Sequence, residues 1–293
     1  MKVKLLVLFI LFINIADCQG NFMVYQMIGE VKTIINNQHK SIKMGQLLKA
    51  NSSLFIGKES GVVLICDNYT PFTVKTAGIW TLAGFIDSCD KETQSLTSGY
   101  FKYMWTQLRQ TEKNPGEDRR EFMRNSGAVV RGYPCNEITI DPLFDTINIR
   151  NGNLRLRWKT TLPPNKFTIE CYDAEKDGKL LYRSGAPDNY IMTDSIKKYA
   201  RGNEMVYWNF VLDGKEICNR KLFHIWKTND FKIYLENMKK MIPPGTGDAE
   251  RFYMTGFLLE SGRFFAQARE FYQKAVRLNS REKRYRLALD ELN

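Results

Sequence analysis

The fold expected of this chain is decided by an alternating run of apolar and basic residues, LRLRWK at positions 154–159. Every second side chain of a β-strand points to the same face of its sheet, so this run has one apolar face that includes Trp158 and one basic face. The same alternation recurs at 167–171 and at 206–212, and the last run ends in the hairpin turn Asp213-Gly214. These strands predict a two-sheet β-sandwich over residues 136–240.

Two features of this segment resemble an immunoglobulin or fibronectin type III sandwich. Leu156-x-Trp158 stands early in the segment, and Tyr199-x-x-Gly202 precedes the strand that contains Trp208. The resemblance implies a sandwich of that family. Residues 151–240 also carry more than half of the net charge of +11.

Residues 22–135 open with short runs rich in β-branched residues, separated by turn residues, which predicts an all-β unit. Three groups of residues resemble a FecR-type domain: Val24 with Gly29 and Val31, then Gly45-Gln46-Leu47-Leu48, then the run at 60–65. The resemblance implies an extracytoplasmic location. The signalling members of that family also carry a cytoplasmic tail and a membrane span. Neither is predicted in this sequence, so a role in sigma-factor regulation is not expected.

A helical extension of this unit is expected within residues 96–125. Phe101, Met104, Trp105 and Leu108 have the spacing of one stripe of an amphipathic helix, which we interpret as a packing face. Four arginines stand either on a solvated helix face or at an anion-binding site: Arg119, Arg120, Arg124 and Arg131.

After a linker rich in proline and glycine, residues 248–293 predict a C-terminal helical hairpin with a cap helix. Five small or aromatic residues resemble one tetratricopeptide repeat, with helices near 249–261 and 264–278: Phe252, Gly256, Ala268, Tyr272 and Ala275. A third helix is expected over 281–292. A lone repeat cannot form a continuous core, so it must dock on its neighbour, on a second copy or on a partner. The exposed contact residues that we expect for a protein partner are Arg251, Met254, Leu258 and Arg269.

The first 18 residues predict a secretory signal, with a basic start and a short apolar run that ends near Cys18. Lipidation of Cys18 is the alternative to simple cleavage. Export permits disulfides, and Cys66 with Cys89 and Cys171 with Cys218 are possible pairs. The other interpretation is that these cysteines and Cys135 are buried thiols.

The sequence lacks the common catalytic motifs and has only two histidines, so we expect no enzyme, no metal and no cofactor. We predict a mainly β chain with α-helices that acts as an exported scaffold or protein-interaction module of the cell envelope. Its expected location is periplasmic, outer-membrane-associated or extracellular, without a membrane span after signal cleavage and without a nucleic-acid partner. The alternatives are a component that senses extracytoplasmic signals and a module that binds a glycan or an anionic envelope polymer, with exposed Tyr182, Tyr190 or Tyr207 stacking on sugars.

Overall fold

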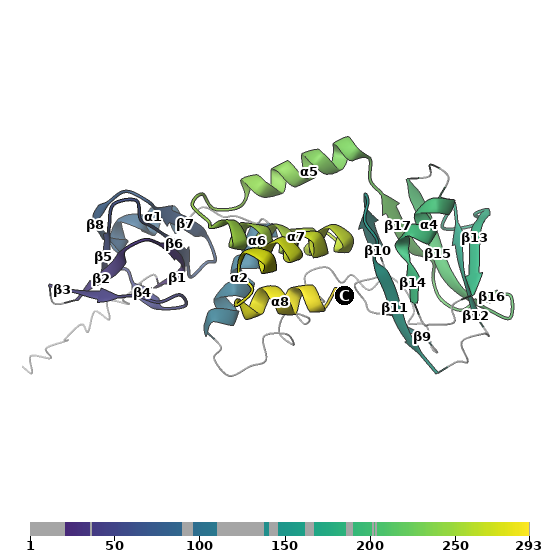
Figure 1. Ribbon diagram of the computed structural model, residues 1–293, viewed down its shortest axis with the longest axis horizontal. Helices are drawn as coiled ribbons and strands as arrows, with labels where there is room; N and C mark the ends of the chain where they lie inside the picture. The colour runs from purple at the N-terminus through teal and green to yellow at the C-terminus, as the bar shows by residue number, and fades with distance from the viewer. Residues whose placement is uncertain are drawn as a thin grey trace, which may run out of the picture.

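The computed structural model describes residues 21–35, 37–89, 96–109, 138–140, 146–161, 167–185, 190–200, 202 and 204–292. It combines β-sheets with α-helices, as the sequence predicts. Figure 1 shows two β-units at opposite ends of the molecule, with most of the helices between them. The C-terminal helices therefore follow both β-units in the sequence but lie between them in space.

The first β-unit, residues 21–89, contains two antiparallel sheets of four strands each. One sheet has the order β4 (Leu47–Lys49), β1 (Asn21–Ile28), β6 (Gly61–Cys66) and β7 (Pro71–Val74). The other has the order β3 (Gln38–Ser41), β2 (Val31–Ile35), β5 (Ser53–Ile56) and β8 (Gly78–Thr81). Val24, Leu54 and Leu64 belong to the apolar core of this unit. A 3-10 turn (Leu82–Phe85) and the short helix α1 (Ile86–Cys89) end the unit.

The second β-unit, residues 138–225, also has two sheets. The larger sheet has the order β10 (Thr146–Ile149), β17 (Lys221–Ile225), β15 (Met205–Leu212), β12 (Phe167–Tyr172) and β13 (Leu180–Gly185), with β16 (Lys215–Glu216) paired to β15. The smaller sheet has the order β14 (Tyr190–Met192), β11 (Arg155–Thr160) and β9 (Ile138–Ile140), and α4 (Thr193–Tyr199) follows β14.

The two sheets of the second β-unit face each other across aromatic side chains. The ring of Trp158 in β11 lies 5.0 Å from that of Phe210 in β15 and 6.2 Å from that of Phe167 in β12. The alternation at 154–159 thus produces the buried and exposed faces that it predicts. His224 lies half-buried in β17, as expected of a strand histidine.

Five helices form the middle of the molecule. They are α2 (Leu96–Arg109), α5 (Thr228–Lys240), α6 (Asp248–Ser261), α7 (Phe265–Leu278) and α8 (Lys283–Asp290). Helices α6 and α7, which we call the helical hairpin, match the two predicted helices closely, and α8 is shorter than its prediction. Residues 228–240 were predicted to belong to the sandwich, but they form α5, whose Phe231 and Met238 are buried.

One apolar core connects these parts. It contains Met23 of β1, Tyr100 of α2, Phe257 of α6 and Trp208 of β15. Among the described residues, we find no helix that is both long enough and apolar enough to cross a membrane.

Candidate functional site: the helical hairpin and its contacts

The two hairpin helices are in close contact at Gly256. A methyl group at this position would lie 2.7 Å from the ring of Tyr272, so any larger residue would push the helices apart. Ala268 and Ala275 are fully buried, and the Tyr272 hydroxyl donates a hydrogen bond of 2.7 Å to Glu260. The structure therefore places the small residues of the repeat pattern at the helix contact.

Phe252 lies at the edge of this contact rather than at its centre. Its ring is half-buried and lies 6.1 Å from the ring of Phe271 on α7. The Lys274 ammonium lies over both rings, 5.8 Å from the centre of Phe252 and 4.9 Å from that of Phe271. These aromatic rings form a patch at the hairpin surface.

The four candidate partner contacts do not share one exposed surface. Arg251 is exposed and lies 3.7 Å from the carboxylate of Asp248. Met254 and Leu258 are completely buried, which corrects the expectation that they face a partner. Arg269 is half-buried and donates a hydrogen bond of 2.8 Å to the carbonyl oxygen of Asn153.

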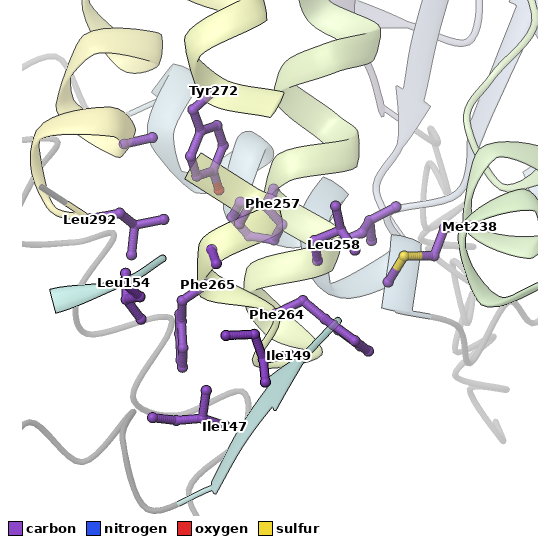
Figure 2. Close-up of a cluster of buried hydrophobic side chains, with 14 of the residues drawn as sticks. Ile147, Ile149, Leu154, Met238, Phe257, Leu258, Phe264, Phe265, Tyr272 and Leu292 are labelled. Atoms are coloured by element: carbon purple, nitrogen blue, oxygen red, sulfur yellow. The ribbon is translucent and has the colours of Figure 1, made fainter. Parts of the chain in front are cut away.

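Helices from elsewhere in the chain cover the hairpin faces that were expected to be open. The ring of Tyr103 in α2 stacks on that of Phe257 at 5.3 Å, and the Tyr100 ring meets the same phenylalanine at 4.9 Å. Figure 2 shows Met238 of α5 on the side of Leu258. Because these apolar faces are filled by the chain itself, the repeat docks on its own neighbours.

The second β-unit packs against the turn of the hairpin. Figure 2 shows Ile147 and Ile149 of β10 beside Phe264 and Phe265. The backbone N–H of Asn148 donates a hydrogen bond of 3.0 Å to the carbonyl oxygen of Arg263. The side-chain amide of Asn148 donates a second one, of 2.8 Å, to the carbonyl oxygen of Gly262. The hairpin is therefore tied to this unit by apolar and polar contacts.

The first β-unit is tied to the helices by a buried carboxylate, Glu250 in the first turn of α6. Its side chain accepts hydrogen bonds from the hydroxyls of three tyrosines, one each from β1, α2 and α8: Tyr25, Tyr100 at 2.7 Å and Tyr285 at 2.5 Å. The Arg284 guanidinium lies 3.4 Å from the same carboxylate. We call these five residues the Glu250 cluster.

Burial raises the pKa of the three tyrosines in the Glu250 cluster. Desolvation raises the pKa of Tyr25 and of Tyr100 well above its usual range, and the charge of Glu250 raises each pKa further. The pKa of Tyr285 is raised by the same two causes. These tyrosines therefore keep the protons that they donate to Glu250. No sequence pattern predicts this cluster, because its members are far apart in the sequence and no local spacing connects them.

The tyrosines considered for sugar stacking are half-buried rather than exposed. The ring of Tyr182 stacks on that of Tyr199 at 4.5 Å, and the Arg155 guanidinium covers one face of Tyr190 at 4.6 Å. The Tyr207 hydroxyl points to the sulfur of Met205. None of the three therefore stands as a free ring at the surface.

Of the four cysteines that the structure describes, three are disulfide-bonded and one is a free thiol. Cys66 and Cys89 form a disulfide that links α1 to β6, which confirms one of the two predicted pairings. Cys171 is a buried free thiol, and Cys218 is disulfide-bonded, so the predicted pair Cys171–Cys218 is wrong. Cys171 lies among apolar residues of the core, where burial raises its pKa to about 12.

Several predictions fall on residues outside the described ranges. These are the prediction of a signal segment that ends near Cys18, the interpretation of Cys135 as a buried thiol, and the candidate anion site at Arg119, Arg120, Arg124 and Arg131. Within the described residues, no group of three or more His, Cys, Asp or Glu side chains is arranged to hold a metal ion.

No family model matches this chain, and no curated protein matches it. The resemblances to the FecR-type, immunoglobulin-like and tetratricopeptide families thus stay predictions.

Proposed function

We propose that this protein is an exported, non-enzymatic scaffold of the cell envelope, in which the helical hairpin holds two β-units apart and presents a protein-binding surface. The observation that carries the proposal is that the hairpin packs on both units. It contacts β1 through the Glu250 cluster and β10 through Asn148. A helical repeat used as an internal spacer is consistent with a structural role.

The cysteines support the exported location. Disulfides persist in oxidising compartments and are rare in the cytosol, and this chain has Cys66–Cys89 as well as a disulfide at Cys218. An N-terminal sequence of the purified protein tests export. We expect the mature chain to begin at Gln19, or at a lipidated Cys18, and a protein recovered from the cytosol with Met1 in place would overturn this part of the proposal.

The strand arrangement supports an immunoglobulin-like second β-unit. Strands β17, β15, β12 and β13 have the spatial order of the G, F, C and C′ strands of such a sandwich, and β14, β11 and β9 have the order E, B and A. Tyr199 and Trp208, which carry the resemblance, are in the expected places before and within β15.

Contacts within the first β-unit support a FecR-like unit. Gly29 has a φ of 72°, and its Cα lies so close to Ser60 that a Cβ would overlap the Ser60 side chain. Both residues belong to the runs that carry the resemblance. Gly45, in the second of these groups, also has a positive φ, of 80°.

The partner surface that we propose is the part of the hairpin that the described residues leave uncovered. It contains the aromatic patch of Phe252 and Phe271. Further along α7 it contains Lys274 and Leu278, and the exposed fraction of Leu278 is 57%. Arg277 adds a second exposed cation beside the leucine. An apolar residue surrounded by cations suits a protein partner with a hydrophobic side chain flanked by carboxylates.

A pull-down with the mature chain as bait tests this surface. Removing residues 244–293 is a poor test, because it would also remove Glu250 and uncover Tyr25 and Tyr100. The sharper variant is Leu278→Glu, and Ile233→Glu is its control, because Ile233 is 61% exposed on α5, away from the hairpin face. We expect Leu278→Glu to lose an envelope partner that wild type and Ile233→Glu both retain. Equal recovery by all three baits would refute the docking role.

A further inference from the structure

A row of three cations lies on the outer face of the small sheet of the second β-unit. Arg155, Arg157 and Lys159 occupy every second position of β11 and are exposed, whereas Leu156 and Trp158 between them are buried. Alternate residues of a strand are about 7 Å apart, so the three charges follow the strand and each lies within one Debye length of its neighbour in the row. We call it the β11 cation row.

The β11 cation row is not neutralised by the described part of the chain. None of its three side chains forms an ion pair with a described carboxylate, and Asp194, on the helix that follows β14, is paired with Lys197 at 2.5 Å. The Arg155 guanidinium lies over the ring of Tyr190, which leaves its charge uncompensated. Three neighbouring like charges repel one another, and a bound anion would reduce this repulsion, so the row favours anion binding.

Protection of a sheet edge does not explain the row. Lysines and arginines often guard edge strands against unwanted pairing. Every residue of the row, however, lies in a paired stretch of β11: Arg155 and Arg157 lie opposite β14, and Lys159 lies opposite β9. The row therefore does not follow one unpaired edge along its whole length.

We propose that the β11 cation row binds a linear, carboxylate-bearing polysaccharide that lies along the strand. A row of charges along a strand matches an extended chain with an acid on successive sugars better than a compact anion. The planar guanidinium groups of Arg155 and Arg157 suit carboxylates, because each can donate two parallel hydrogen bonds to one acid group. Tyr190, which lies opposite Arg157 on β14, adds a half-exposed aromatic ring next to the row.

A membrane surface fits this face less well. Among the described residues, the large apolar side chains that are exposed lie on other elements, so this sheet offers nothing to insert between lipids. The proposal rests on the proposed function only for its setting, since an exported protein meets envelope polysaccharides.

The test measures binding of purified, full-length mature protein to three probes: oligogalacturonate, neutral dextran and poly(glycerol phosphate). The test variant is the triple change Arg155→Gln, Arg157→Gln and Lys159→Gln. The control triple, Lys232→Gln, Lys239→Gln and Lys240→Gln, removes the same charge from exposed positions of α5. We expect oligogalacturonate to bind wild type and the control equally within about twofold, and the β11 variant about tenfold or more weakly at low salt. Dextran should not bind.

Three outcomes would overturn the proposal: no binding of oligogalacturonate, equal losses in the two triple variants, or tighter binding of poly(glycerol phosphate) through the same row. If the triple variant does not fold, Arg157→Gln replaces it, with an expected loss of about threefold. The assay uses purified protein, so a failure here leaves export and scaffolding untouched. Recovery of the protein from the cytosol would instead contradict the proposed function, whatever the binding result.

Discussion

Glu250 is the residue at which the most distant parts of the chain meet. Its carboxylate is bonded by β1, α2 and α8 while it lies in the first turn of α6, where the helix dipole favours a negative charge. A buried charge is tolerated only when it is paired and hydrogen-bonded. The Glu250 cluster meets this requirement with three hydroxyls and Arg284, so each of its members depends on the others.

We expect Glu250→Gln to lower the free energy of unfolding by about 2–4 kcal/mol, because it leaves the buried Arg284 with only the Glu282 carboxylate as counter-charge and places an amide donor against hydroxyl donors. Urea unfolding of the purified protein measures the change. Asp248→Asn is the matched control, since it removes an exposed carboxylate from the same turn and should change stability by less than about 0.5 kcal/mol. Similar effects of the two changes would contradict the role given to the cluster.

The cluster also predicts a loss of stability in alkali. The usual tyrosine pKa of 10.0 applies to the unfolded chain, whereas the pKa values of Tyr25 and Tyr100 are raised well above it in the folded protein. Below pH 10 both states hold these protons, and above it only the folded state does, so the free energy of unfolding must fall as pH rises. Urea unfolding between pH 8 and pH 11 checks this. A stability that is constant, or that rises, over this range would contradict it.

At the scale of elements, local spacing accounts for the helical hairpin. Helix α7 is amphipathic, α6 is buried over residues 253–260, and the small residues Gly256 and Ala268 lie where the two helices touch. Helix α5 illustrates the opposite case. Its apolar residues have helical spacing, and Asp230 and the two final lysines suit its dipole, yet it was predicted to be part of a β-unit because it directly follows the strand β17.

Gly256→Ala is the change that tests the helix contact. Alanine favours a helix over glycine by about 1 kcal/mol. Its methyl group would nevertheless clash with the ring of Tyr272, so we expect a net destabilisation of about 1–3 kcal/mol. Thermal unfolding followed by circular dichroism gives the result. Gly84→Ala is the control, because nothing lies within 4 Å of the added methyl group. A stabilised Gly256→Ala protein would show that the helices are less tightly packed than described.

At the scale of the whole molecule, a shared core predicts that the helices and the second β-unit unfold together. Trp226, between β17 and α5, packs its ring 5.1 Å from that of Phe264 in the hairpin turn, and Asn148 bonds the same turn. In urea, the helical circular dichroism signal and tryptophan fluorescence should therefore follow one transition. Two well-separated transitions would show that the hairpin and the second β-unit are independent.

The sequence by itself determined the elements that depend on neighbouring residues. The alternation at 154–159 describes one face of a strand, and the spacings of Phe252 with Gly256 and of Ala268 with Tyr272 each describe one face of a helix. Such periodicity is a local property. Only the tertiary structure decided what each face contacts. The apolar character of Met254 and Leu258 does not tell whether they face a partner or the core. They are buried because α5 and α2, which lies about 150 residues earlier in the sequence, pack on this helix. The residues of the Glu250 cluster are likewise brought together only in the folded chain, and no spacing along the sequence predicts their contact.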